Sequence, residues 1–137
     1  MKRSFTAAAT NEAIIVLMRD AVAFLKENGV TSRSLYIGEL VLEEILTNIV
    51  KYGYDDAHGH QVEVVSAVDG GLVSMEFRDD GRPFDPLSAP PPKFGEAVKT
   101  QRMGGRGIYL VKIMVKQSHY RREDNRNILS VVFPARS

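Results

Sequence analysis

A carboxylate, an amide and an amine recur at helical spacing in the segment EEILTNIVKYGYDD, Glu43 to Asp56. On a helical wheel of about 100° per residue, Glu44, Asn48 and Lys51 fall within about 60° of one another, on one border of an apolar arc. Glu43 falls near the other border, so the two adjacent glutamates are not equivalent. Side chains of these three types can serve as a general base, a Mg²⁺ ligand and a phosphate contact. A solvated helix edge with one i,i+4 pair is the alternative.

The segment RDDGRPFDP, Arg78 to Pro86, directly follows an expected strand. An Asp at the end of a strand, with a Gly two residues later, lets a carboxylate point into a pocket while the backbone approaches a flat ligand. Such a carboxylate can accept a hydrogen bond from an exocyclic amine. A plain turn is the alternative, because Asp-Gly and Arg-Pro are common turn residues.

The segment GGRGIYLVK, Gly104 to Lys112, places glycines at the start of an expected helix. Backbone N–H groups there are open to an anion, and the helix dipole adds to the attraction. The segment lacks the GK[ST] of a Walker motif. A proline-rich stretch and not a strand precedes it, so it is not the dinucleotide fingerprint either. The hinge of a flexible lid is the alternative.

Apolar periodicity and turn residues predict the elements that must position these groups. Their order predicts a two-layer α/β sandwich, with helices on one face of a mostly antiparallel, mixed sheet. The stretch 83–103 holds five of the six prolines and no sustained periodicity, which predicts a long loop or a functional lid. The expected strands are Arg3–Ala9, Gln61–Val68, Leu72–Asp79, Ser118–Asp124 and Ile128–Pro134, and the expected helices are Glu12–Asn28, Thr31 or Ser32 to about Tyr52, and Gly104–Gln117.

Length and composition indicate one domain, residues 1–137, with an ordinary globular core. The net charge of +1 provides no strong field to attract nucleic acid or an acidic membrane. The absence of cysteine excludes disulfides and suits a reducing compartment. The apolar run AIIVLM ends at Arg19, too early for a signal core or a membrane span. We therefore expect a soluble cytoplasmic protein.

Together, in this order, the three segments resemble the motifs of the GHKL ATPases, which share the Bergerat nucleotide-binding fold. EILTNIVKYG is similar to their N box, DDGRPF to the first glycine box and GGRGIYLV to the second, and the resemblance covers about Leu35 to Pro134. Within the superfamily, the short stand-alone chain and the motif RPFDP look most like the bacterial anti-sigma-factor serine/threonine kinases of the RsbW type.

The resemblance implies ATP and Mg²⁺ as cofactors and assigns a role to each matching residue. Glu44 would be the general base, Asn48 would bind Mg²⁺, and Lys51 would approach the phosphates. Asp79, selected over Asp80 by the pattern Asp-x-Gly, would accept from the adenine amine. The glycines that would allow close approach of the backbone are Gly81 at the adenine and Gly104, Gly105 and Gly107 at the phosphates.

The same resemblance implies a protein partner. Kinases of this type phosphorylate a serine of a small STAS-domain anti-anti-sigma protein, many also sequester a sigma factor, and they are commonly homodimers. The sequence departs from the superfamily pattern at three positions. Pro83 stands where many members have the second glycine of the first box, Arg106 lies between the glycines of the second, and Asn127 replaces a frequent threonine.

Two other functions are compatible with the motifs. One is a nucleotide-gated regulatory module without significant kinase activity, although pure binding does not require a base such as Glu44. The other is a catalytic module that acts in trans on a histidine-bearing partner, since Lys51-Tyr52 also resembles the N box of sensor histidine kinases. The segment DDAHGH, 55–60, suggests either a metal site or a polar turn, and we favour the turn.

Overall fold

Five strands form a single sheet in the computed structural model, which describes residues 1–52, 59–88 and 105–136. The strand order is β1-β2-β3-β5-β4, and every pairing between these strands is antiparallel. The predicted α/β sandwich is therefore confirmed, with an antiparallel sheet and no mixed pairing among the described strands. The strands are β1 (Lys2–Ala8), β2 (Gln61–Asp69), β3 (Leu72–Asp79), β4 (Gln117–Glu123) and β5 (Arg126–Pro134).

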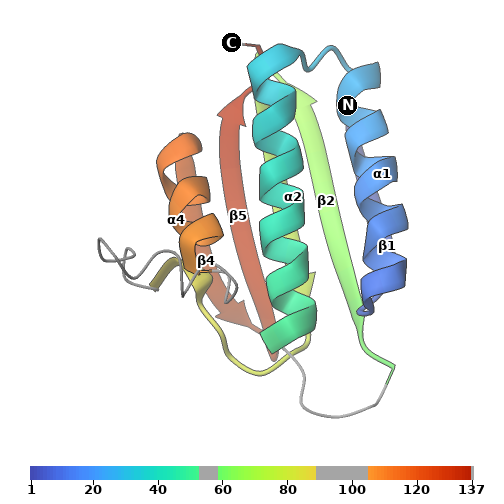
Figure 1. Ribbon diagram of the computed structural model, residues 1–137, viewed down its shortest axis with the longest axis vertical. Helices are drawn as coiled ribbons and strands as arrows, with labels where there is room; N and C mark the ends of the chain where they lie inside the picture. Colours follow the sequence, from blue (N-terminus) through green and yellow to red (C-terminus); the bar gives the residue numbers. More distant parts are fainter. Residues whose placement is uncertain (53–58, 89–104, 137) are drawn as a thin grey trace.

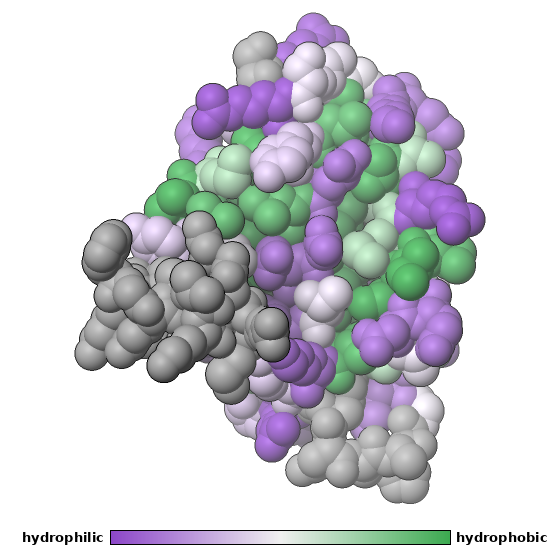
Figure 2. Space-filling view, in the orientation of Figure 1, coloured by the Kyte–Doolittle hydropathy of each residue, from purple (hydrophilic) through white to green (hydrophobic). Residues whose placement is uncertain are grey.

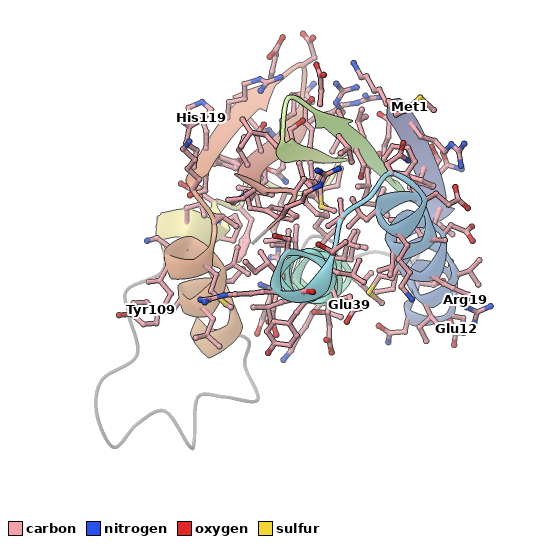
Figure 3. All side chains as sticks on the ribbon, turned by 90° about the horizontal axis from the view of Figure 1, so that it is seen from above. Met1, Glu12, Arg19, Glu39, Tyr109 and His119 are labelled. Atoms are coloured by element: carbon pink, nitrogen blue, oxygen red, sulfur yellow. The ribbon has the colours of Figure 1, made fainter. Side chains whose placement is uncertain are left out.

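Within the described residues, three helices cover one face of this sheet (Figure 1; seen from above in Figure 3). They are α1 (Asn11–Glu27), α2 (Ser32–Tyr52) and α4 (Gly105–Met114), and a short 3-10 helix, η1, spans Pro86–Ser88. The Thr10 side chain caps α1 by accepting from the backbone N of Ala13 at 3.2 Å. The core lies between the two layers, where α1, α2 and α4 pack on alternate residues of the central strands; its largest fully buried side chains include Phe24, Leu42, Leu46, Phe77 and Phe133.

The sheet face that the helices leave uncovered carries a chain of ion pairs. Arg78 contacts Glu63 at 3.3 Å and Glu76 at 3.1 Å. Arg121 contacts the other oxygen of Glu76 at 2.9 Å and Glu123 at 3.0 Å. Partly exposed pairs such as these contribute little individually to stability. The chain of pairs makes this face charged, in contrast to the apolar face under the helices.

Two tight turns set the register of the sheet. Gly70 and Gly71 join β2 to β3, and both have positive φ. Asp124 and Asn125 join β4 to β5 with φ of 52° and 62°. Positive φ at both central positions is typical of the hairpin turns that match strand twist. The second turn is short, because β5 already begins at Arg126.

The largest difference from the predicted elements is at the end of α4. The sequence predicts a helix to Gln117, but α4 ends at Met114 and Gln117 begins β4. The backbone N of Lys116 donates to Val132 O at 2.7 Å, so the chain enters the sheet as soon as the helix ends. The helix and the sheet compete for the N–H of Lys116, and helical spacing in the sequence does not show which of them binds it.

The helix side of the molecule exposes several large apolar side chains (Figure 2). Ile15 and Val16 on α1 are about half exposed, and Ile113 on α4 is 60% exposed. Among the residues that the structure describes, no helix is long and apolar enough to cross a membrane.

Candidate functional site

A pocket lies between α2 and the ends of the central strands. It holds about 390 Å³ of empty space, part of it open to solvent. Its walls are mostly apolar, and its few polar groups come from α2, β3, β4 and β5. A mostly apolar hollow with a few convergent polar groups is typical of a small-molecule site. The described residues that line it are Ile45, Asn48, Ile49, Phe77, Asp79, Phe84, Pro86, Tyr120, Asn127 and Leu129.

Asp79, the last residue of β3, is the buried carboxylate of this pocket. Its Oδ1 accepts from the backbone N of Gly81 at 2.9 Å and from Nδ2 of Asn127 at 3.0 Å. Burial raises the pKa of Asp79, while these two hydrogen bonds oppose the rise. The neighbouring Asp80 is exposed and pairs instead with His60 at 3.1 Å. Of the two adjacent aspartates, only Asp79 lines the pocket under the helices.

Gly81 contributes both of its backbone groups to the same corner. Its N–H binds Asp79, and its carbonyl accepts from Nη1 of Arg122 at 2.7 Å. The backbone after β3 is thereby folded back against the end of β4. Asp79 lines the pocket and also accepts from the N–H of the turn that follows β3.

Asn127 was missed as a site residue in the sequence interpretation, which noted it only as a departure from a family pattern. It is 5% exposed and lies directly opposite Asp79 in the β3–β5 register. Its amide donates to Asp79 and to Arg82 O at 2.9 Å. The signal that could have found it is the strand register, which depends on residues 48 positions apart.

One side of α2 carries the predicted triad, with unequal burial. Asn48 is 7% exposed and lines the pocket. Glu44, one turn earlier, is half-buried, and Lys51 is exposed with its Nζ 5.3 Å from the ring centre of Tyr52. Only Asn48 of the three lies on the apolar pocket itself.

Glu44 lies against the first turn of α4. A Cβ added to Gly107 would overlap the Glu44 carboxylate, so the two groups are in direct contact. Burial raises the pKa of Glu44, and the charge of Glu43 adds to the rise. A carboxylate with a raised pKa is a stronger base at neutral pH. Glu43 is exposed and lines the groove between α1 and α2, on the other side of the helix, as the wheel predicted.

The other predicted phosphate contacts lie at or before the start of α4. Gly105 is its first residue. Gly104 lies outside the described residues, as do most of the predicted lid and residues 53–58 of the predicted polar turn. The side chain of Lys112 on α4 donates to Leu87 O of η1 at 2.8 Å, which links the described start of the lid segment to α4.

The polar edge of α2 suits Mg²⁺, which needs few protein ligands, and does not resemble a dedicated metal site with many ligands. Within the described part of the chain, no group of three or more His, Cys, Asp or Glu side chains could hold a metal. Mg²⁺ usually takes one or two protein ligands and completes its shell with phosphate oxygens and water. Asn48 on α2 offers one side-chain oxygen ligand of that kind.

The sequence matches a known family of ATPase domains. The model of the histidine kinase-like ATPase domain matches residues 7–133, and the chain belongs to this family. Among curated proteins, the chain is similar to the serine/threonine-protein kinase BtrW of Bordetella bronchiseptica. The two are 24% identical over 131 residues, which cover 96% of this chain and 89% of the relative.

A solved structure shows the same fold. The histidine kinase AdeS of Acinetobacter baumannii superposes with a TM-score of 0.52 and 13% sequence identity, over 98% of this chain and 68% of that chain. At this identity the likeness concerns the fold alone. The family membership makes ATP the expected ligand of the pocket.

Proposed function

We propose that this protein is an ATP-dependent serine/threonine kinase that phosphorylates a STAS-domain anti-anti-sigma partner. The observation that carries the proposal is the position of Glu44, a half-buried carboxylate with a raised pKa one turn from the pocket residue Asn48. Binding alone does not require a base at this place. The similarity to a relative named as a serine/threonine kinase supports the same reaction.

In this proposal the pocket holds adenine, with Asp79 accepting from its exocyclic amine and Gly81 allowing close approach. Asn48 holds Mg²⁺, which would neutralise charge on the phosphates. Lys51 approaches the phosphates from α2. The backbone of Gly104, Gly105 and Gly107 approaches them from the start of α4.

The chemical step follows from these positions. The Glu44 carboxylate takes the proton of the partner's serine hydroxyl while its oxygen attacks the γ-phosphorus. A bond forms between the serine oxygen and phosphorus, and the bond to the β,γ-bridging oxygen breaks. ADP leaves with the electron pair of that bond. We place the reaction in the cytoplasm, where ATP and such partners occur together. We also propose a sigma factor as a second protein ligand.

Incubation with γ-labelled ATP and candidate partners tests the proposal. Phosphoserine on a STAS-domain protein, recovered by pull-down from the native host, is the expected product. Nucleotide binding without label transfer would support a regulatory binding module instead. Acid-labile phosphohistidine would support a catalytic module acting in trans. A melting temperature unchanged by millimolar ATP and Mg²⁺ would remove the basis for all three, since a ligand of the folded state must raise it.

A further inference from the structure

Both N–H groups of the Asn127 side-chain amide are occupied. One donates to Asp79 Oδ1 at 3.0 Å, and the other donates to the backbone carbonyl of Arg82 at 2.9 Å. Asp79 ends β3 and Arg82 lies in the segment that follows it, whereas Asn127 belongs to β5. The amide therefore binds the carboxylate and the backbone of the following loop at the same time.

The oxygen of the same amide is also occupied. Asn127 Oδ1 accepts from the backbone N of Phe84 at 3.2 Å, from Nη1 of Arg122 at 3.1 Å and from the hydroxyl of Tyr120. A backbone N–H and a guanidinium can only donate, and a carboxylate can only accept. Turning the amide over would place its N–H groups against donors and its oxygen against acceptors. The orientation of Asn127 is therefore fixed by its surroundings.

The amide also holds the backbone on both sides of Pro83. It donates to the carbonyl of Arg82 and accepts from the N–H of Phe84, as a neighbouring strand would. Pro83 has no N–H, so this arrangement leaves it no donor to satisfy. Phe84 is held as a pocket wall, edge-on to Tyr52 with ring centres 5.7 Å apart.

Asp79 is left with one oxygen for a ligand. Its Oδ1 already accepts from Asn127 and Gly81, and no donor in the described residues reaches Oδ2. Because Asn127 fixes the carboxylate through Oδ1, Oδ2 is presented in one orientation. An ionised oxygen can accept from the amine of adenine, whereas the carbonyl oxygen of guanine would repel it.

We infer that Asn127 is a positioning residue that fixes Asp79 and the Phe84 wall and so sets the preference for an amino purine. This inference rests on the proposed ATP site and adds a determinant of its selectivity. Asn127 acts through Asp79 and Phe84 and need not touch the nucleotide.

Asn127→Asp is the sharpest test, since it keeps the shape and the oxygen acceptor and removes both N–H donors. At about pH 8 the variant should bind ATP ~10-fold more weakly or worse, because a hydrogen bond to a charged group is lost and two carboxylates face each other. GTP affinity should change less, so the preference for ATP over GTP should fall. Ser130→Ala, on the same strand but on the open sheet face, is the matched control.

The pH dependence separates positioning from a general structural role. In Asn127→Asp the carboxylates at 79 and 127 should titrate as a coupled pair. In the native protein, burial raises the pKa of Asp79, the hydrogen bonds from Asn127 and Gly81 lower it, Asp80 adds to the rise and Arg122 opposes it. Once the pair takes up one proton, the protonated carboxyl can again donate to its neighbour. Relative to the wild type, ATP affinity of Asn127→Asp should therefore recover as the pH falls from about 8 to about 6. Equal losses for ATP and GTP, or the wild-type pH trend, would overturn the inference.

A second variant tests the same contact without nucleotide. Asn127→Leu keeps the branched shape and removes every hydrogen bond of the amide. The pKa of Asp79, followed by carbon NMR of its carboxyl group in the apo protein, should rise above that of the wild type. An unchanged pKa would show that Asn127 does not hold Asp79. If the wild type binds no ATP, the proposed function fails, and this measurement still decides whether the contact exists.

Discussion

Glu43 and Glu44 are adjacent in the chain, yet they lie in different surroundings, and we expect different roles for them. Glu44 is half-buried against α4, whereas Glu43 is exposed toward α1. Glu44→Gln keeps the size of the side chain and removes the base, so phosphate transfer should fall by ~10²-fold or more while ATP affinity changes little. Asn48→Ala should weaken Mg²⁺-dependent binding and transfer together. Calorimetry and partner phosphorylation measure the two effects.

Glu43→Gln is the matched control for that prediction, because it makes the same chemical change one residue away. It should be nearly silent in both assays. Loss of transfer in Glu43→Gln would show that the helix presents the wrong glutamate to the nucleotide. Wild-type transfer by Glu44→Gln would favour a regulatory module over an enzyme.

The raised pKa of Glu44 predicts how transfer depends on pH. The carboxylate acts as a base only when ionised, so the rate of transfer should rise with pH through a pKa above the ordinary glutamate value. Nucleotide affinity, measured in Glu44 variants, should not show the pH dependence that the rate of transfer shows in the wild type. Single-turnover rates measured between about pH 5 and pH 8 check the prediction. A rate that is level across this range would mean that Glu44 does not carry the proton.

The ionised Asp79 carboxylate should lower the stability of the folded protein while it contributes to ATP binding. Because its pKa is raised in the folded protein, the folded state binds the proton more tightly than the unfolded state does. The stability contribution of this group is therefore full below the unfolded pKa and is lost as pH rises through the folded pKa. Asp79→Asn should remove that decline in the free energy of unfolding and weaken ATP binding by ~10-fold or more.

Denaturant unfolding at several pH values, with and without ATP, measures both parts of the Asp79 prediction. Asp80→Asn is the control, since Asp80 is exposed and pairs with His60. It should leave ATP affinity near that of the wild type. Equal ATP affinity in Asp79→Asn and the wild type would show that this carboxylate does not read the base.

At the scale of elements, α2 and α4 meet where a glycine leaves room for a carboxylate. Ala at position 107 would place its Cβ in the space of the Glu44 carboxylate. The carboxylate is the end of a flexible side chain, so Gly107→Ala should displace it and lower phosphate transfer, with little loss of melting temperature because alanine favours a helix over glycine by up to ~1 kcal/mol. Thermal unfolding and partner phosphorylation measure the change.

The Glu44→Ala background provides the control for Gly107→Ala. Without the carboxylate there is no overlap, so the same substitution should be more stabilising in this background than in the wild type, through its helix propensity. A larger gain in melting temperature in the Glu44→Ala background is the expected result. The same change of melting temperature in both backgrounds would mean that a Cβ at position 107 does not meet Glu44.

The elements themselves were largely predictable from sequence, and the contacts between them were not. The period of 3.6 in α2 and the glycines between β2 and β3 are local signals, and they placed those elements within a residue or two. Local signals also separated Glu44 from Glu43. The contact of Glu44 with Gly107 depends on how two helices pack, and the pairing of Asp79 with Asn127 depends on strand order. Neither of these two contacts produces a periodic pattern that could be recognised in the sequence.

At the scale of the whole molecule, we expect the segment from Pro86 to Met103 to close over bound nucleotide. Most of it lies outside the described residues, and Leu87 near its start accepts a hydrogen bond from Lys112 of α4. Limited proteolysis should cut the apo protein in this segment first, and ATP with Mg²⁺ should protect it. Asp79→Asn, which should bind ATP poorly, should show no such protection. Identical cleavage of the wild type with and without ATP would argue for a plain loop.

The order of the strands also bears on how the protein is made. β5 is inserted between β3 and β4, so the partner of Asp79 is translated 48 residues after it. Until β5 emerges from the ribosome, the aspartate has no neighbouring strand on that side and the pocket has no far wall. If ATP binds this pocket as proposed, a nascent chain or a fragment without β5 lacks Asn127 and should gain no stability from the nucleotide. Stabilisation by ATP would then be restricted to chains in which β5 has joined the sheet.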